Sequence, residues 1–159
     1  MRTMRNDNPA SIEWYRKIRP QYLDLAELLR TLLVELLRTQ HLGVLSVTTR
    51  TKRLDSVREK LRRKKYENPR QDLTDLCGAR IIVYLETEIP AVERLIRYSF
   101  RVDDSRSIDK SSVLQPNEVG YRSLHLICSF TPARCELPEY EADKCFHRPQ
   151  APSAGLQGA

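Results

Sequence analysis

The spacing of apolar residues predicts a long helix in the first quarter of the chain. From Gln21 to His41, leucines recur three and four positions apart and form one wide buried stripe. Residues 11–19 predict a helical segment before it, and Pro20 is expected to break or restart the helix. Gly43 is expected to end it, because glycine readily adopts the left-handed backbone of a C-cap.

The next segment combines an extended stretch and a second amphipathic helix. Residues 44–49 (VLSVTT) are rich in β-branched side chains and predict extended backbone. Apolar residues then recur at helical spacing, which predicts a helix from a cap at Asp55 to about Lys65. Ser56 and Lys60 lie four positions apart and therefore share one face of that helix.

The second half of the chain predicts strands around another helix. Residues 78–86 (GARIIVYLE) alternate as a strand does, and Pro90 opens a helix to about Tyr98. Residues 100–105 and 121–130 predict two more strands, separated by a polar loop over 104–119. Helices followed by strand–helix–strand–loop–strand predict an α+β domain, a mixed sheet flanked by helices.

The strand expected over residues 121–130 has two unlike faces. A tyrosine ring on its polar face offers a stacking surface for a base, and a histidine beside it offers a hydrogen bond. The apolar face carries Leu124, Leu126 and Cys128, and the polar face carries Tyr121, Ser123 and His125.

Composition narrows the classes of protein. The chain has 159 residues, of which 40% are hydrophobic, and this suits one folded domain. There is no run of eighteen uncharged apolar residues and no apolar core of a secretory signal, so a cytoplasmic location is expected.

The net charge of +6 favours polyanionic partners such as nucleotides, RNA or DNA. Six of the basic residues fall within positions 58–65, either as a solvated helix face or as a grip on RNA.

The four cysteines do not form a recognisable metal motif. Cys77 and Cys128 stand beside apolar residues and are expected to be buried. Cys135, Cys145 and His147 do not have the spacing of a common zinc site, and their role stays open.

Residues 50–60 (RTKRLDSVREK) predict a polyphosphate site. Phosphates need several fixed donors, and a helix start adds its dipole. Asp75 stands just before a strand and is a candidate Mg²⁺ ligand, since magnesium takes one or two carboxylates and completes its shell with water and phosphate. Arg80 can lie flat against a base, or can pair with Asp75 for structure alone. The candidate phosphate ligands are Arg50, Lys52, Ser56 and Lys60.

Together these motifs resemble the synthetase domain of the RelA/SpoT family, the enzymes that make the alarmone (p)ppGpp. The resemblance spans residues 12–141 and is closest to the single-domain members, with a nucleotidyltransferase-like fold. The matching pattern is R-x-K-x-x-x-S-x-x-x-K over residues 50–60, D-x-x-x-x-R-I-I over 75–82, the pair Asp109–Lys110, and G-Y-x-S-x-H over 120–125.

The resemblance implies transfer of the β,γ-pyrophosphate of ATP to the 3′-hydroxyl of GDP or GTP, with Mg²⁺, in the stringent response. On the donor side it implies that Arg50 and Arg80 sandwich the adenine and that the ATP phosphates are held by Lys52, Ser56 and Lys60. It implies that Asp75 binds Mg²⁺ and that the catalytic residues are Asp75, Lys52 and Lys60. The acceptor site is implied to be lined by Lys110, Tyr121, Ser123 and His125.

One departure from the family pattern bears on activity. The family continues with an E-I-Q-x-R-T motif, whose glutamate is thought to help bind Mg²⁺ and activate the acceptor hydroxyl. Here residues 136–141 (ELPEYE) resemble its lead-in, but the motif itself does not follow. We therefore expect a partial synthetase domain over residues 11–141, incomplete at its C-terminal end, with weak or no turnover. Residues 1–10 are expected to be flexible and residues 142–159 disordered.

Two alternative functions are also compatible with the sequence. Toxic relatives within the family pyrophosphorylate the 3′ end of tRNA. A non-enzymatic RNA-binding module would explain the basic surface but would leave Asp75, Tyr121 and His125 without a role. Self-association is also left open.

Overall fold

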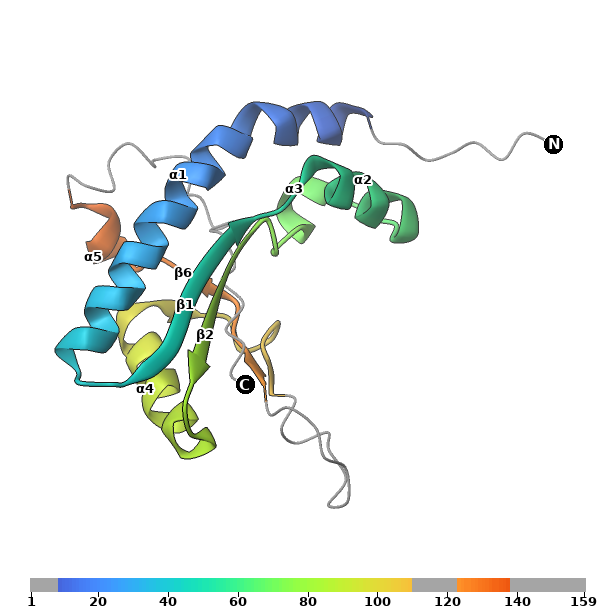
Figure 1. Cartoon of the computed structure of the whole chain (residues 1–159). Coiled ribbons are helices and arrows are strands. Elements are labelled where there is room, and N and C mark those ends of the chain that lie inside the picture. Colours follow the sequence, from blue (N-terminus) through green and yellow to red (C-terminus); the bar gives the residue numbers. More distant parts are fainter. Residues whose placement is uncertain (1–8, 110–122, 138–159) are drawn as a thin grey trace, which may run out of the picture.

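A computed structural model describes residues 9–109 and 123–137 of the chain (Figure 1). A long helix lies along a two-stranded antiparallel ribbon, and shorter helices and strands surround them. In chain order the elements are α1 (Pro9–Thr39), β1 (Val44–Thr51), α2 (Leu54–Arg63), α3 (Pro69–Asp72), β2 (Cys77–Val83), the 3₁₀ helix η1 (Glu86–Glu88), α4 (Ile89–Ser99), β3 (Arg101–Val102), β4 (Ile108–Asp109), β5 (Leu124–His125), β6 (Cys128–Ser129) and α5 (Pro132–Cys135).

The strands confirm the α+β prediction, with one difference in how they pair. β1 pairs with β2, β3 with β6 and β4 with β5, each in antiparallel fashion. Over residues 9–109 and 123–137 the strands thus form three two-stranded sheets, where the sequence predicted one mixed sheet. The longest ladder, β1–β2, places Thr48 opposite Arg80 and Arg50 opposite Gly78.

The core lies between α1 and one face of the β1–β2 ribbon. Alternate residues of β2 are buried, as its period of two predicts, and Thr51 of β1 is tied to α1 by a hydrogen bond from its hydroxyl to the Tyr22 carbonyl, 2.9 Å long. Burial raises the pKa of the Cys77 thiol to about 12, so Cys77 behaves as the small buried hydrophobe that was expected. The core includes Tyr15, Tyr22, Leu25, Leu29, Leu33 and Leu37 of α1, Cys77, Ala79, Ile81 and Val83 of β2, and Val92, Leu95 and Ile96 of α4.

The prediction that Pro20 breaks the first helix is wrong. α1 runs without interruption through Pro20, and Figure 1 shows that it changes direction in its N-terminal half. A proline inside a helix removes one backbone donor and pushes away the carbonyl four residues earlier, which bends the helix. The packing of α1 over the ribbon compensates for that loss, so the helix bends instead of ending.

The prediction that Gly43 caps α1 is also wrong. His41 has φ of 56°, the left-handed conformation, and Thr39 is the last helical residue. The His41 N–H donates to the Arg38 carbonyl and the Leu42 N–H to the Leu37 carbonyl, both at 3.0 Å. These are the two hydrogen bonds of a Schellman motif, which satisfy carbonyls of the last turn.

The second helix starts earlier than its expected cap. α2 begins at Leu54 and ends at Arg63, and Asp55 lies within its first turn instead of capping it. There the Asp55 carboxylate pairs with Arg58 at 3.1 Å, and a negative charge in a first turn also suits the helix dipole.

The strand predicted over residues 121–130 is divided into β5 and β6. Between them the Ile127 N–H donates to the Ser107 hydroxyl at 3.0 Å, and its carbonyl accepts from the Asp103 N–H at 2.8 Å. The bond from Asp103 continues the register of the β3–β6 pairing, whereas the Ser107 hydroxyl takes the place of the Asp103 carbonyl as acceptor for the Ile127 N–H. The ladder ends there, and β5 pairs with β4 instead. The predicted apolar face is confirmed, because Leu126 and Cys128 are buried.

Several sequence predictions fall outside the described residues. They concern residues 1–8, the region of Lys110 and Tyr121, and the tail over residues 142–159. α1 begins at Pro9, inside the stretch that was expected to be flexible. Among the described helices, none is long and apolar enough to cross a bilayer.

Candidate nucleotide-binding site

Two lysines converge on one carboxylate oxygen where β1, α2 and β2 meet. Lys52 Nζ lies 2.6 Å and Lys60 Nζ 2.8 Å from Oδ2 of Asp75. All three side chains are partly covered, with exposed fractions of 18%, 19% and 39% for Lys52, Lys60 and Asp75. The structure therefore brings together the three residues that the sequence named as catalytic. Lys52 and Lys60 both form ion pairs with Asp75. The sequence had left open whether Arg80 forms such a structural pair with Asp75.

The two oxygens of Asp75 have different surroundings. Oδ2 accepts from both lysines, whereas Oδ1 is buried and has no hydrogen-bond partner in the described part of the chain. Burial raises the pKa of the Asp75 carboxyl, but the hydrogen bonds and charges of Lys52 and Lys60 outweigh it, so that the pKa lies below its usual 3.8. Asp75 is thus ionised at neutral pH, and only one of its two oxygens accepts hydrogen bonds from the described residues.

Secondary structure explains how three distant sequence positions meet. Lys52 and Arg53 form the short connection from β1 to α2, and Lys60 lies two turns further along α2. Asp75 precedes β2 by two residues, and the Lys52 N–H donates to the carbonyl of Leu76 at 2.8 Å. This hydrogen bond joins the end of β1 to the entrance of β2, and so holds Lys52 beside Asp75.

Arg50 and Arg80 lie on the face of the ribbon opposite the α1 core. The pairing of Arg50 with Gly78 and of Thr48 with Arg80 puts both arginines on one face, diagonally across the ladder. The Arg50 side chain lies over Gly78, where no side chain obstructs it. Both arginines are exposed, as is Ser56 one helical turn before Lys60. This face can receive a planar group next to the lysine–carboxylate cluster.

The acceptor segments are only partly described. β4 pairs with β5 so that Ile108 lies opposite His125 and Asp109 opposite Leu124. The pairing brings Asp109 next to the strand that carries His125. Ser123 directly precedes that strand, and both Ser123 and His125 are half-buried. Lys110 and Tyr121 lie outside the described residues, so their roles stay predictions.

Comparison with known proteins assigns the family. The model of the region found in RelA / SpoT proteins matches residues 49–141, more than half of the chain. The chain belongs to the RelA/SpoT family. The matched range contains Lys52, Lys60 and Asp75, while α1 lies before it.

Solved structures of RelA/SpoT relatives share the fold. Small alarmone synthetase 1 from Bacillus subtilis, bound to its product pppGpp, is 23% identical, with a TM-score of 0.64 over 92% of this chain and 71% of that one. The same protein bound to AMPCPP gives 19% identity and a TM-score of 0.58, with 92% and 68% covered. A GTP pyrophosphokinase family protein from Streptococcus pneumoniae gives 22% and 0.63, again with 92% and 68% covered. No curated protein matches the chain significantly.

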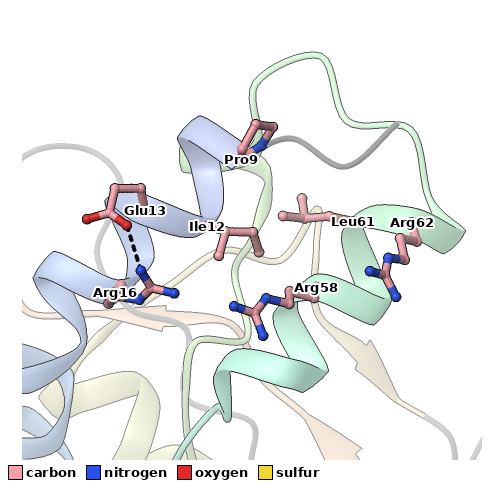
Figure 2. Close-up of a pocket in the computed structure, with 7 residues that line it drawn as sticks. All are labelled: Pro9, Ile12, Glu13, Arg16, Arg58, Leu61 and Arg62. Atoms are coloured by element: carbon pink, nitrogen blue, oxygen red, sulfur yellow. Dashed lines mark hydrogen bonds and ion pairs between the residues drawn. The ribbon is translucent and has the colours of Figure 1, made fainter. Parts of the chain in front are cut away.

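A separate basic pocket lies between the N-terminal end of α1 and α2 (Figure 2). Its volume is about 270 Å³, and Arg16 and Arg58 point into it. Arg16 pairs with Glu13 at 2.9 Å and Arg58 with Asp55 at 3.1 Å. Arg58 is two positions from Lys60, about 200° around the helix, so the pocket and the cluster of Lys52, Lys60 and Asp75 use different faces of α2. The pocket is lined by Pro9, Ile12, Glu13, Arg16, Arg58, Leu61 and Arg62.

Two residues that contact the site were not predicted from the sequence. The Tyr15 hydroxyl and Arg19 Nε of α1 both donate to the main-chain carbonyl of Lys52, at 2.6 and 3.4 Å. Tyr15 falls in the buried stripe of the first helix, and a buried tyrosine hydroxyl needs a hydrogen-bond partner, so the sequence could have indicated that Tyr15 makes such a contact. The identity of that partner depends on the tertiary fold.

The described residues offer Asp75 as a single candidate carboxylate for a metal. They contain no group of three histidine, cysteine or acidic side chains placed to hold an ion. Cys135 is a free thiol of α5, while Cys145 and His147 lie outside the described residues.

Proposed function

We propose that this chain is a small alarmone synthetase domain that transfers pyrophosphate from ATP to the 3′-hydroxyl of GDP or GTP. One observation carries the proposal: Lys52 and Lys60 converge on Asp75 within hydrogen-bond distance. Two ammonium groups beside an ionised carboxylate suit a metal-bound polyphosphate better than a neutral ligand. Family membership supports the same chemistry.

The lysines are the proposed phosphate ligands of the donor. In the absence of nucleotide, Asp75 neutralises part of their charge. When ATP binds, its phosphate oxygens replace Asp75 Oδ2 as acceptors for Lys52 and Lys60, and Ser56 contributes a hydroxyl from the preceding turn of α2. Arg50 and Arg80 hold the adenine on the open face of the ribbon.

Mg²⁺ fits the residues present. Asp75 Oδ1 is a buried carboxylate oxygen with no partner among the described residues, and magnesium is commonly held by one carboxylate together with phosphate and water. When bound, the ion would neutralise negative charge on the phosphates during transfer. Asp75 is therefore the proposed protein ligand.

In the proposed reaction the 3′ oxygen of the acceptor forms a bond to the β-phosphorus of ATP. The bond from that phosphorus to the oxygen bridging the α- and β-phosphates breaks, and AMP leaves with the bridging oxygen. The acceptor's hydroxyl proton is released to solvent in the net reaction. Lys52 and Lys60 stabilise charge on the transferred group. Lys110, Tyr121, Ser123 and His125 are the proposed acceptor residues.

Binding and product formation test the proposal separately. Mg²⁺–ATP should bind more tightly than AMP, because AMP lacks the two phosphates that the lysines contact. Product formation is measured from labelled ATP with GDP, GTP or tRNA, and Asp75→Ala serves as the inactive control. Because the sequence lacks the family's E-I-Q-x-R-T motif, turnover is expected to be low, and binding is the more sensitive measurement. Equal affinity for ATP and AMP would count against a polyphosphate site.

The tRNA arm of that assay addresses the alternative acceptor. Arg62, Arg63, Lys64 and Lys65 at the end of α2 are exposed, and exposed basic side chains suit an RNA backbone. Labelling of tRNA in preference to GDP and GTP would identify the chain as the tRNA-modifying type.

A further inference from the structure

The main-chain carbonyl of Lys52 is held by side chains from a distant part of the chain. Tyr15 Oη donates to it at 2.6 Å and Arg19 Nε at 3.4 Å, both from α1. On the other side of the same residue, the Lys52 N–H donates to the Leu76 carbonyl at 2.8 Å. Both polar groups of the Lys52 main chain are therefore fixed, although Lys52 lies between β1 and α2 and belongs to neither.

We propose that Tyr15 is a positioning residue for the donor site, acting through the peptide group that joins Lys52 to Arg53. Its hydroxyl fixes the plane of that peptide and so the direction in which the Lys52 side chain leaves the backbone. This role rests on the proposed function, because Lys52 is there the ligand of the ATP phosphates.

The surroundings of Tyr15 suit a rigid donor. The side chain is fully buried, and its ring packs against the rings of Trp14 and Tyr22, with centroids 6.4 and 6.1 Å away. Burial raises the pKa of the Tyr15 phenol to about 12, so the hydroxyl keeps its proton throughout the neutral range. Because packing holds the Tyr15 ring in place, its hydroxyl has a fixed position, and the hydrogen bond holds the Lys52 carbonyl next to it.

The junction has a particular need for such a contact. Strand ladders and helix turns fix the peptides within them, but the connection over Lys52 and Arg53 has neither pattern. α2 begins at the next residue, so the same contact also sets the start of the helix that carries Ser56 and Lys60. A phosphate site needs its donors fixed before the ligand arrives.

The first test compares Tyr15→Phe with Tyr22→Phe. Both changes remove one hydroxyl from a buried tyrosine of α1, and Tyr22 serves as the matched control. Tyr15→Phe should weaken Mg²⁺–ATP binding by about two- to tenfold, the usual range for one net hydrogen bond, and should leave AMP binding unchanged. Tyr22→Phe should leave the ratio of ATP to AMP affinity as in the parent. An equal loss for ATP and AMP would overturn the proposal, because it would indicate a general disturbance of the fold.

A double-mutant cycle with Lys52→Ala separates positioning from general stability. If Tyr15 acts mainly through Lys52, Tyr15→Phe should cause a clearly smaller fold-loss of ATP affinity once the lysine side chain is gone, with any remaining loss coming from the start of α2. The same fold-loss in both backgrounds would overturn the proposal. Should Tyr15→Phe fail to fold by circular dichroism, Arg19→Met removes the second donor from the same carbonyl at a half-buried position and is expected to shift affinity in the same direction.

A measurement without nucleotide distinguishes this proposal from the proposed function. The amines are acylated under limiting conditions, and the extent at each lysine is measured by mass spectrometry. Tyr15→Phe should increase acylation of Lys52 several-fold relative to Lys65, whose exposed side chain is the internal reference. Unchanged acylation of Lys52 would overturn the positioning role. Increased acylation in a chain that does not prefer ATP to AMP would retain the positioning role and reject the polyphosphate site.

Discussion

The side chain of Arg50 lies directly over Gly78 on the neighbouring strand. A β-carbon placed on Gly78 would stand 3.8 Å from both Cγ and Nε of Arg50, which is ordinary van der Waals contact. The glycine thus gives Arg50 a flat stretch of backbone on which to lie, and an added methyl group would touch the arginine without displacing it. A longer side chain at position 78 would compete with Arg50 for the same space.

Substitutions at Gly78 should therefore have graded effects. Gly78→Ala should leave binding of AMP and ATP unchanged and raise the free energy of unfolding by about 0.4–1 kcal/mol, because alanine has fewer conformations in the unfolded chain. Gly78→Leu should weaken AMP and ATP by the same factor, since Arg50 is proposed to contact the adenine that both share. Calorimetric titration and urea unfolding provide the two measurements. A selective loss of ATP in Gly78→Leu would instead place Arg50 on the phosphates.

The end of α1 offers a test of stability away from the nucleotide site. His41 has a φ of 56°, where a side chain is strained and glycine is not. His41→Gly should raise the free energy of unfolding by about 1 kcal/mol, at the low end of the cost of the left-handed conformation. Gly43→Ala is the control substitution at the glycine that the sequence predicted as the cap. An added β-carbon there meets nothing within 4 Å and φ is not positive, so alanine at position 43 should cause no strain in the folded chain. Urea unfolding of both variants checks this, and destabilisation by His41→Gly would show that the imidazole itself supports the cap.

The sequence assigns Lys52, Lys60 and Asp75 to one candidate site, and the structure brings them together because the geometry that links them is local. Lys52 and Lys60 are separated by a short connection and two turns of one helix, and Asp75 stands at the entrance of the strand that pairs with β1. Once α2 has formed and β1 has paired with β2, the backbone positions of Lys52, Lys60 and Asp75 are close together, and their side chains meet. The same holds for the buried alternate residues of β2.

Contacts between distant segments could not be predicted in this way. The partner of the Tyr15 hydroxyl is 37 residues away, and no local spacing indicates it. The division of the last strand depends on the Ser107 hydroxyl, which takes the place of a ladder acceptor for Ile127. The predictions for Pro20 and Gly43 were wrong for a related reason: tertiary packing keeps a helix through a proline, and a Schellman motif can form around a residue other than glycine, here His41.

The depressed pKa of Asp75 predicts how acid affects stability. Because its folded-state pKa lies below 3.8, the ionised carboxylate stabilises the fold above that value, and this contribution is lost as the pH falls through 3.8 and below. Asp75→Asn should therefore reduce the free energy of unfolding at pH 7, and the difference from the parent should shrink as the pH approaches 3. Urea unfolding across this pH range measures it.

Asp55→Asn is the control for the effect of acid. It removes an exposed carboxylate that pairs with Arg58 on the surface of α2, where such pairs contribute about 0–1 kcal/mol. The free energy of unfolding of Asp55→Asn at pH 7 should therefore differ little from that of the parent. A difference for Asp75→Asn that stays constant down to pH 3 would mean that the lysines do not favour the charged form.

Lys52 should distinguish the donor nucleotide from the acceptor. Its ammonium group lies 2.6 Å from Asp75 and is covered except for 18% of its side chain, so a phosphate that replaces Asp75 would meet a fixed charged donor. Lys52→Ala should weaken Mg²⁺–ATP by about 1.5–3 kcal/mol, the usual contribution of a hydrogen bond to a charged group, while AMP and GDP should change little. Lys65→Ala, which removes an equal charge from an exposed position, controls for the general loss of positive charge. Calorimetric titrations with the three nucleotides at one salt concentration make the comparison. If Lys65→Ala weakens ATP as much as Lys52→Ala does, the attraction comes from the basic surface as a whole and not from the lysine–carboxylate cluster.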